Sequence, residues 1–77
     1  MEENQERILL NFGRRVRELR GALGVSQEAL GDLAGIDRTY VSGVERGRRN
    51  ATVLTIHKFA AALGVEPADL LRPPKSD

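Results

Sequence analysis

Four polar side chains near the middle of the sequence could together make directional hydrogen bonds to a planar ligand. Their spacing puts them on the outward side of one predicted helix: Arg38, Thr39, Ser42 and Arg46. The guanidinium group of an arginine is a planar fork of donors that matches a phosphate group or the O6 and N7 acceptors of guanine. A threonine can touch a thymine methyl group or accept a hydrogen bond. These residue types predict non-covalent recognition of a nucleic acid rather than covalent chemistry.

The charged residues are segregated along the chain, although its formal net charge is only +1. Residues 38–49 contain four arginines and Glu45, a local charge of +3, whereas residues 25–37 contain three acids and no base, a local charge of −3. A basic cluster of this kind attracts phosphate groups and gives salt-dependent affinity. Residues 48–50 are therefore expected to contact a nucleic-acid backbone, with a solvated basic loop as the alternative.

Two short helices joined by a tight turn are predicted to position these side chains. Ser26 and Asp37 precede helices expected at about 27–34 and 38–46, and both are residue types that cap a helix by accepting hydrogen bonds from free N–H groups. Each cap lies between apolar residues five positions apart, the spacing of a hydrophobic staple: Val25 with Leu30, and Ile36 with Val41. Gly35 suits the left-handed backbone that ends the first of the two helices. Such a pair predicts a helix-turn-helix.

The segment from Gln27 to Arg46 resembles the helix-turn-helix of the Cro/phage-repressor (XRE-type) family. The matching positions inside the motif and at its end are Gln27, Leu30, Gly35, Ile36, Val41, Val44 and Glu45-Arg46-Gly47. The resemblance extends over about sixty residues, from Phe12 to Leu71. Within the family, the chain is similar to the controller proteins of restriction–modification systems through three strings: Asp37-Arg38-Thr39-Tyr40-Val41-Ser42-Gly43, Glu45-Arg46-Gly47-Arg48-Arg49-Asn50 and Ile56-His57-Lys58.

The resemblance implies a sequence-specific transcriptional regulator that binds a pseudo-palindromic operator in double-stranded DNA as a homodimer. Two-fold symmetry would set the half-sites about one helical turn, roughly 34 Å, apart. The residues assigned to base reading are Arg38, Thr39, Ser42 and Arg46, and those assigned to the DNA backbone are Gln27, Tyr40, Gly43, Arg48, Arg49 and Asn50. In the family, the loop that corresponds to residues 48–50 grips phosphates or dips toward the bases, and for Tyr40 the alternative is packing alone. Gly43 would let DNA approach the helix backbone or would simply permit tight packing. The resemblance also implies a structural ion pair between Arg20 and Glu45.

Three further helices are expected to complete an all-α, compact five-helix bundle, in a single domain that spans residues 1–77. A first helix is expected at about 6–23, a fourth at about 53–63 after the cap Thr52, and a short fifth from Pro67. Apolar residues at helical spacing are expected in the core: Ile8, Phe12, Val16, Leu19, Leu23, Leu30, Leu33, Ala34, Val41, Val44, Val53, Ile56, Phe59, Ala60 and Leu63. The ordered part is expected to span about 6–71, with flexible termini.

Gly31 occupies a position where the family usually has alanine and where the reading helix crosses. The position must be small, which glycine satisfies. Because alanine has a higher helix propensity by about 1 kcal/mol, Gly31→Ala is expected to stabilise the fold.

Four residues toward the C-terminus are candidates for a dimer interface: Leu54, His57, Leu70 and Leu71. Leu54 should lie on the outer face of its helix and so suggests a subunit contact, although a single exposed leucine is common. Leu70 and Leu71 are adjacent and point in different directions, so one of them is expected to face a partner subunit.

The composition argues against other classes of protein. The chain has no cysteine and one histidine, so no metal site and no cofactor are expected. No catalytic residue is expected either, because His57 lacks an accompanying nucleophile and the carboxylates are dispersed; this argues against an enzyme such as a nuclease. No apolar run approaches the roughly 18 residues of a membrane span, and the N-terminus lacks a signal pattern. A cytoplasmic protein is therefore expected.

The sequence leaves two protein partners open. The alternative to a controller protein is an antitoxin-type repressor, which would also bind a toxin protein through its final helix and tail. The acidic residues Glu28 and Asp32 could contact RNA polymerase when a dimer lies beside a promoter.

Overall fold

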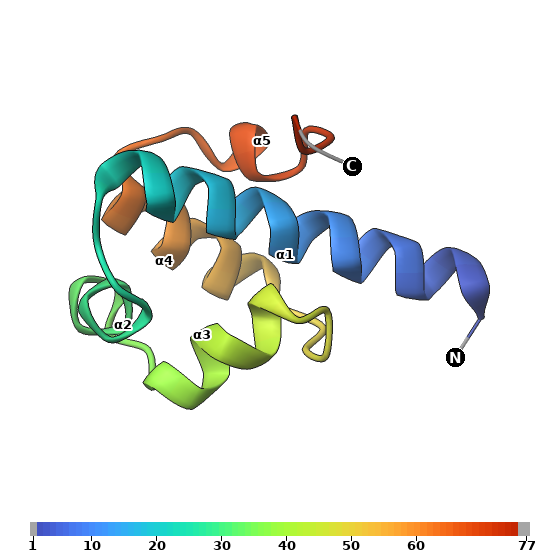
Figure 1. Ribbon diagram of the computed structural model, residues 1–77, viewed down its shortest axis with the longest axis horizontal. Coiled ribbons are helices and arrows are strands. Elements are labelled where there is room, and N and C mark those ends of the chain that lie inside the picture. Colours follow the sequence, from blue (N-terminus) through green and yellow to red (C-terminus); the bar gives the residue numbers. More distant parts are fainter. Residues whose placement is uncertain (1, 76–77) are drawn as a thin grey trace.

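Residues 2–75 are described by the computed structural model, in which five α-helices follow one another along the chain (Figure 1). Their bounds are α1 (Glu3–Leu23), α2 (Gln27–Ala34), α3 (Arg38–Glu45), α4 (Val53–Leu63) and α5 (Pro67–Leu70). No strand forms between residues 2 and 75, so the prediction of an all-α five-helix fold is confirmed. α2 and α3 form the predicted helix-turn-helix, and Arg46 is the C-terminal cap of α3 rather than its last residue.

The predicted capping residues account for where α2 and α4 begin. The side-chain oxygens of Ser26 and Thr52 accept hydrogen bonds from the amides of Ala29 at 3.0 Å and Thr55 at 3.1 Å. Gly35 has a φ of 70°, the left-handed conformation expected where α2 ends. The connection between the two helices of the motif is therefore set by local chemistry.

α1 begins earlier than predicted, so residues 3–6 are helical rather than frayed. The backbone N–H of Glu2 donates to the side-chain oxygen of Gln5 at 3.3 Å. Glu3 and Glu6 place negative charge in the first turn. Both features stabilise a helix N-terminus, where free N–H groups carry partial positive charge.

All five helices contribute to one hydrophobic core. Its buried side chains are Phe12, Val16, Leu30, Val41, Val44, Phe59, Ala60, Leu63 and Leu70. Four residues predicted for the core are instead largely exposed: Ile8 (57%), Leu23 (46%), Leu33 (60%) and Val53 (73%). Figure 1 shows the N-terminal part of α1 extending beyond the other helices, so its apolar stripe continues where no neighbouring helix covers it.

Gly13 and Gly31 lie where another segment passes too closely for a side chain. A Cβ atom on Gly13 would lie 2.3 Å from the backbone oxygen of Val44, so α1 crosses the end of α3 at backbone contact. A Cβ atom on Gly31 would lie 2.4 Å from the backbone oxygen of Ile36. A backbone oxygen cannot swing aside as a flexible side chain can. The structure therefore reverses the expectation that Gly31→Ala stabilises the fold.

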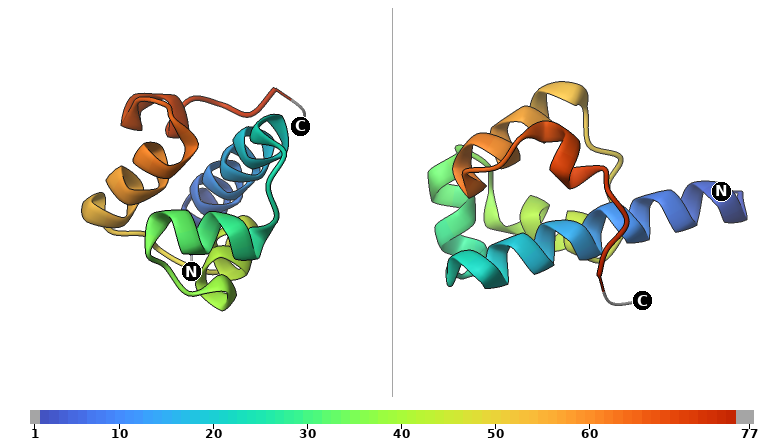
Figure 2. Two further views of the ribbon diagram at one scale, coloured as in Figure 1. Left: turned by 90° about the vertical axis from the view of Figure 1, so that its left-hand side faces the viewer. Right: turned by 90° about the horizontal axis from the view of Figure 1, so that it is seen from above.

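The chain after α5 turns back onto α1 (Figure 2). Pro74 is buried, and the backbone N–H of Lys75 donates to Glu18 Oε2 at 2.7 Å. Arg15 Nε donates to the backbone oxygen of Asp69 at 2.7 Å, which ties α1 to α5. This docking of residues 72–75 differs from the flexible tail expected there; the rest of that tail, 76–77, lies outside the described residues.

Candidate nucleic-acid interface

The side chains predicted to read bases lie around one hollow on the outer side of α3. The hollow has a volume of about 180 Å³ and is lined by Gln27, Arg38, Thr39, Ser42 and Arg46. Arg38, Thr39 and Arg46 are exposed, and Figure 1 shows α3 at the edge of the molecule away from α5. The structure thus brings together all four predicted base readers, with Gln27 contributed by α2.

Contacts on the inner side and at the start of α3 fix the helix so that the side chains of the hollow point outward. Val41 and Val44 have no exposed surface and pack in the core. At the start of the helix, Asp37 accepts hydrogen bonds from the Thr39 hydroxyl and, at 2.8 Å, from the Thr39 amide. These two hydrogen bonds hold the pKa of Asp37 below its ordinary value, and the bond from the hydroxyl has the larger effect. Since its hydroxyl proton is engaged, Thr39 can offer a base its methyl group and acceptor lone pairs.

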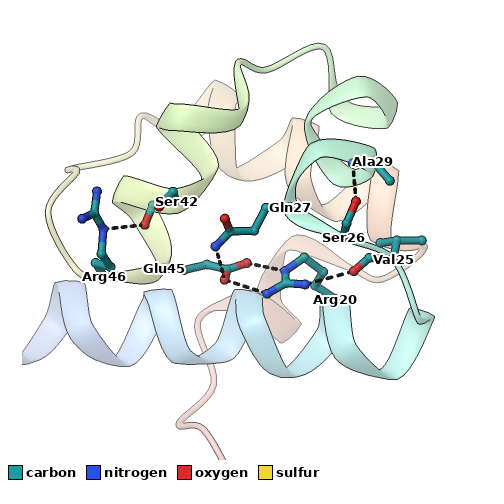
Figure 3. A network of polar contacts seen from close by, with 8 residues as sticks. All are labelled: Arg20, Val25, Ser26, Gln27, Ala29, Ser42, Glu45 and Arg46. Carbon is teal, nitrogen blue, oxygen red and sulfur yellow. Dashed lines mark hydrogen bonds and ion pairs between the residues drawn. The ribbon is translucent and has the colours of Figure 1, made fainter.

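A charged network joins α1, α2 and α3 behind the hollow (Figure 3). Arg20 Nε donates to Glu45 Oε2 at 2.7 Å, and a second Arg20 nitrogen donates to Glu45 Oε1 at 3.0 Å. Gln27 Nε2 donates to the same Oε1 at 3.0 Å. The Glu45 side chain is only 4% exposed. Hydrogen bonding between Arg20 and Glu45 is the main cause that raises the pKa of Arg20. The Arg20–Glu45 ion pair is confirmed, and Gln27 is a third member that sequence reasoning missed.

The network limits how Gln27 could contact a phosphate. Its amide nitrogen carries two hydrogens, and the bond to Glu45 uses one of them. The second hydrogen and the carbonyl oxygen are left for an external ligand. The predicted phosphate contact stays a prediction, made by a side chain that Glu45 orients from behind.

The outward side of Gly43 is covered by another side chain of the same protein. The residue is buried, and a Cβ atom placed on it would lie 3.0 Å from Cγ and 3.2 Å from Nε of Arg49. The guanidinium carbon of Arg49 lies 5.2 Å from the centroid of the Tyr40 ring. Arg49 therefore packs against α3 at Gly43, in line with the tight-packing alternative, and the DNA contact at Gly43 stays a prediction. A glycine in mid-helix was the one sequence signal of this packing.

The two neighbours of Arg49 in the loop belong to a different surface. Arg48 and Asn50 are exposed and line a hollow of about 400 Å³ with residues from the start of α1: Gln5, Ile8 and Leu9. The residues predicted to contact the DNA backbone are therefore divided between two surfaces, one at α3 and one beside the N-terminal half of α1.

One member of the predicted dimer interface is corrected by the structure. The Leu70 side chain is fully buried in the core of its own chain, so it cannot face a partner subunit. Leu71 and Leu54 are each 67% exposed, and His57 is exposed on α4. This division agrees with the expectation that two adjacent leucines point in different directions.

The potential metal-ligating side chains of residues 2–75 are dispersed. No three His, Asp or Glu side chains in this range lie close enough together to hold a metal ion. None of the helices described is both long and apolar enough to cross a membrane. Every buried side-chain nitrogen or oxygen in the same range has a hydrogen-bond partner.

Comparison with known proteins agrees with this geometry. The family described as "Helix-turn-helix" matches residues 16–70. Control protein C.BamHI from Bacillus amyloliquefaciens is 46% identical over 65 residues, which cover 83% of this chain and 80% of that protein. Control protein C.SmaI from Serratia marcescens is 41% identical over 56 residues, which cover 73% of this chain and 67% of that protein.

Solved structures show the same similarity. The restriction–modification controller protein C.AhdI from Aeromonas hydrophila superimposes with a TM-score of 0.79 at 56% identity, covering 80% of this chain and 94% of that one. The hypothetical transcription factor NHTF from Neisseria superimposes with a TM-score of 0.81 at 46% identity, covering 91% of this chain and 82% of that one.

Proposed function

The chain belongs to the XRE-type helix-turn-helix family of transcriptional regulators, and from this membership we propose that it is a controller protein of a restriction–modification system. In this role it binds its own operator as a homodimer and sets transcription by occupancy. Its similarity to controller proteins over 80% of its length or more supports the proposal.

The observation that carries the proposal is the hollow of hydrogen-bonding side chains on the outer side of α3. Arg38 and Arg46 contribute two guanidinium forks to it, and Thr39 contributes a methyl group. One fork on O6 and N7 of a guanine discriminates against another base by about 1–3 kcal/mol. A helix with these groups outward suits the major groove, in which recognition helices of this motif lie.

The side chains beside the hollow would hold the DNA backbone and so set the register of α3. Gln27 lies in the first turn of α2, where free N–H groups and the helix dipole favour a phosphate group. The Tyr40 hydroxyl, Arg48 and Asn50 are further donors. Contacts of this kind supply salt-dependent affinity rather than choice of sequence.

A homodimer would match two such helices to a pseudo-palindromic operator. The large apolar side chains of Leu54 and Leu71 are two-thirds exposed, and His57 lies on the same helix as Leu54. Burial of these side chains against a second copy would remove apolar surface from water. A core from a chain of 77 residues is small, so dimerisation would also add stability.

A controller protein acts in the cytoplasm, where it binds its operator, and this role requires no catalytic residue. The relatives named above are described as control proteins and a transcription factor, and they give no support to the antitoxin alternative.

RNA polymerase remains a proposed partner of the exposed acids Glu28 and Asp32 on α2. Charge-reversed variants that bind DNA normally and still activate transcription would rule this contact out.

The proposal is tested by titrating the chain against DNA from its own upstream region and against scrambled DNA, at two salt concentrations. The native region should bind more tightly by about 10³-fold or more. Arg38→Ala should lower the ratio of the affinities for native and scrambled DNA by about five- to 150-fold, while the salt dependence of binding barely changes. Arg72→Ala is the matched control, because it removes the same charge from an arginine beyond α5.

The two results have different meanings. If the native region is preferred and only Arg38→Ala reduces the preference, α3 reads the operator. If the two DNAs bind equally, or neither binds, the chain is not a specific autoregulator and the proposal fails.

A further inference from the structure

We propose that the outward side of α1 is a self-association surface, on which a second copy of this chain packs its own α1 in the antiparallel direction. The surface, called the α1 stripe below, consists of Glu3, Glu6, Leu10, Arg14 and Arg17. It includes none of the residues assigned above to DNA binding or to the dimer contact of Leu54 and Leu71. The inference therefore goes beyond the proposed function and does not depend on DNA recognition.

The α1 stripe is one exposed side of its helix. Its five residues follow one another at intervals of three or four, the spacing of neighbours on a helical face, and all five are exposed. Four of them, Glu3, Glu6, Leu10 and Arg14, also line a common hollow of about 210 Å³. Figure 1 shows the N-terminal half of α1 extending beyond the other helices, which leaves this side accessible to a second copy.

The charges of the α1 stripe are divided between its two ends. The two acids lie on the N-terminal side of Leu10, and the two arginines lie on its C-terminal side. Among residues 2–75, none of these four side chains forms an ion pair. By contrast, Arg15 and Arg20 in the same helix are paired with Glu18 and Glu45. The stripe thus carries two acids at one end and two bases at the other that its own chain does not neutralise.

This order of charges makes the stripe complementary to itself. In a two-fold contact the same surface of both copies meets itself. If two antiparallel helices cross at Leu10, residues equally far from Leu10 on either side lie at the same level. Glu3 of one copy then faces Arg17 of the other, and Glu6 faces Arg14, each pair occurring twice. A parallel arrangement would instead place acid beside acid and base beside base, so the charges favour the antiparallel one.

Leu10 supplies an apolar centre for the contact. It packs against the loop after α3, since a Cβ atom on Gly47 would lie 2.8 Å from Leu10 Cδ2, and it is still 41% exposed. Contact between two such leucines would remove apolar surface from water. The stripe is about 21 Å long and one helix wide, which is smaller than a standard interface. We therefore expect weak association that rises with protein concentration and, because the ion pairs are exposed, falls with salt.

The test uses two charge reversals, each made in the Leu54→Glu protein, which lacks one apolar side chain of the other proposed contact. Two copies of the Glu6→Arg variant would bring arginine against arginine, and two copies of the Arg14→Glu variant would bring glutamate against glutamate. Each variant alone should therefore associate about tenfold more weakly than the Leu54→Glu parent. An equimolar mixture should associate as strongly as the parent, because each facing pair in the mixed dimer again has opposite charges. Sedimentation without DNA, at low salt, measures all four samples.

Methyl NMR spectra give a second readout, at the stripe itself. The Leu10 methyl resonances should move with rising protein concentration in the parent and in the mixture, but in neither variant alone. The methyl resonances of Leu33, which is 60% exposed on α2, should not move. Arg72→Glu is the matched control, because it reverses the charge of an exposed arginine outside the stripe and should leave association unchanged. Thermal melts of the variants check that each is folded.

Three results would overturn the inference. The first is a Leu54→Glu parent that stays monomeric at every concentration while its Leu10 resonances do not move. The second is association that persists in both variants alone, or a mixture that associates as weakly as its components. The third is a set of Leu10 resonances that move on addition of scrambled DNA but not with protein concentration, since the stripe would then bind DNA. The proposed function is tested separately, by the preference for operator DNA, so the two can fail independently.

Discussion

Glu45 links the C-terminal end of α3 to α1 and α2 through hydrogen bonds. Its carboxylate is 4% exposed and accepts two hydrogen bonds from Arg20 and one from Gln27. A carboxylate removed from water is costly unless it is paired and hydrogen-bonded, and here both conditions are met. The network therefore fixes the end of α3 against α1 and orients a side chain of the candidate interface.

Glu45→Ala should lower the free energy of unfolding by about 3 kcal/mol, because it leaves the partly buried Arg20 without its anion. Urea denaturation measures the change. Arg72→Ala is the control: Arg72 is 66% exposed in its ion pair with Asp69, and loss of such a surface pair costs about 0–1 kcal/mol. Equal losses in the two variants would show that the Glu45 network is not a structural contact.

At the scale of elements, glycines set how closely the helices pack. α1 meets the end of α3 at Gly13, and α2 meets the segment before α3 at Gly31. At both places a backbone oxygen occupies the space of a Cβ atom. The orientation of α3, and with it the direction of the side chains that line its outer hollow, therefore depends on two positions with no side chain.

Gly13→Ala and Gly31→Ala should each lower the free energy of unfolding by about 1–3 kcal/mol, because a Cβ atom would force backbone apart. Gly21→Ala in α1 is the control, since a Cβ atom there meets no other atom within 4 Å. That change should stabilise the protein by about 1 kcal/mol through helix propensity. Thermal melts compare the three variants, and stabilisation by all three would contradict the close packing.

At the scale of the whole molecule, the exposed apolar residues suggest where a second copy would bind. Leu54 on α4 and Leu71 after α5 are not among the side chains that line the hollow at α3. A contact made there would leave the reading side of each subunit free for DNA. Dimerisation and DNA binding would then use separate surfaces.

Leu54→Glu should shift the protein from dimer to monomer, because a buried carboxylate without a partner opposes association. Sedimentation at several concentrations measures the equilibrium. Leu33→Glu is the matched control, since Leu33 is 60% exposed on α2, outside the predicted interface. A Leu54→Glu variant that dimerises as strongly as the wild-type protein would exclude Leu54 from the interface.

Much of the fold could be predicted from the sequence because its signals are local. Ser26, Asp37 and Thr52 cap the helices they were expected to cap, and Gly35 ends α2 as expected. A cap acts on amides two or three residues away, so the neighbouring residues suffice to predict it. The grouping of Arg38, Thr39, Ser42 and Arg46 was also predictable, because the spacing of residues on one helix determines which side they share.

Burial could not be predicted in the same way. Ile8 and Val53 continue apolar stripes but are largely exposed, while Pro74 in the expected tail is buried. A stripe shows which side of a helix is apolar, and not whether another element lies there to cover it. Whether an apolar stripe is covered depends on how long each helix is relative to its neighbours.

The sequence by itself determined the five helices, the helix-turn-helix and the side of α3 that carries Arg38 and Arg46. Only the tertiary structure decided that Gln27 joins Glu45 and that Arg49 covers Gly43 beside Tyr40. The physical reason is range: helix periodicity and capping act within a few residues, whereas these contacts arise when the loop after α3 turns back and α1, α2 and α3 pack together.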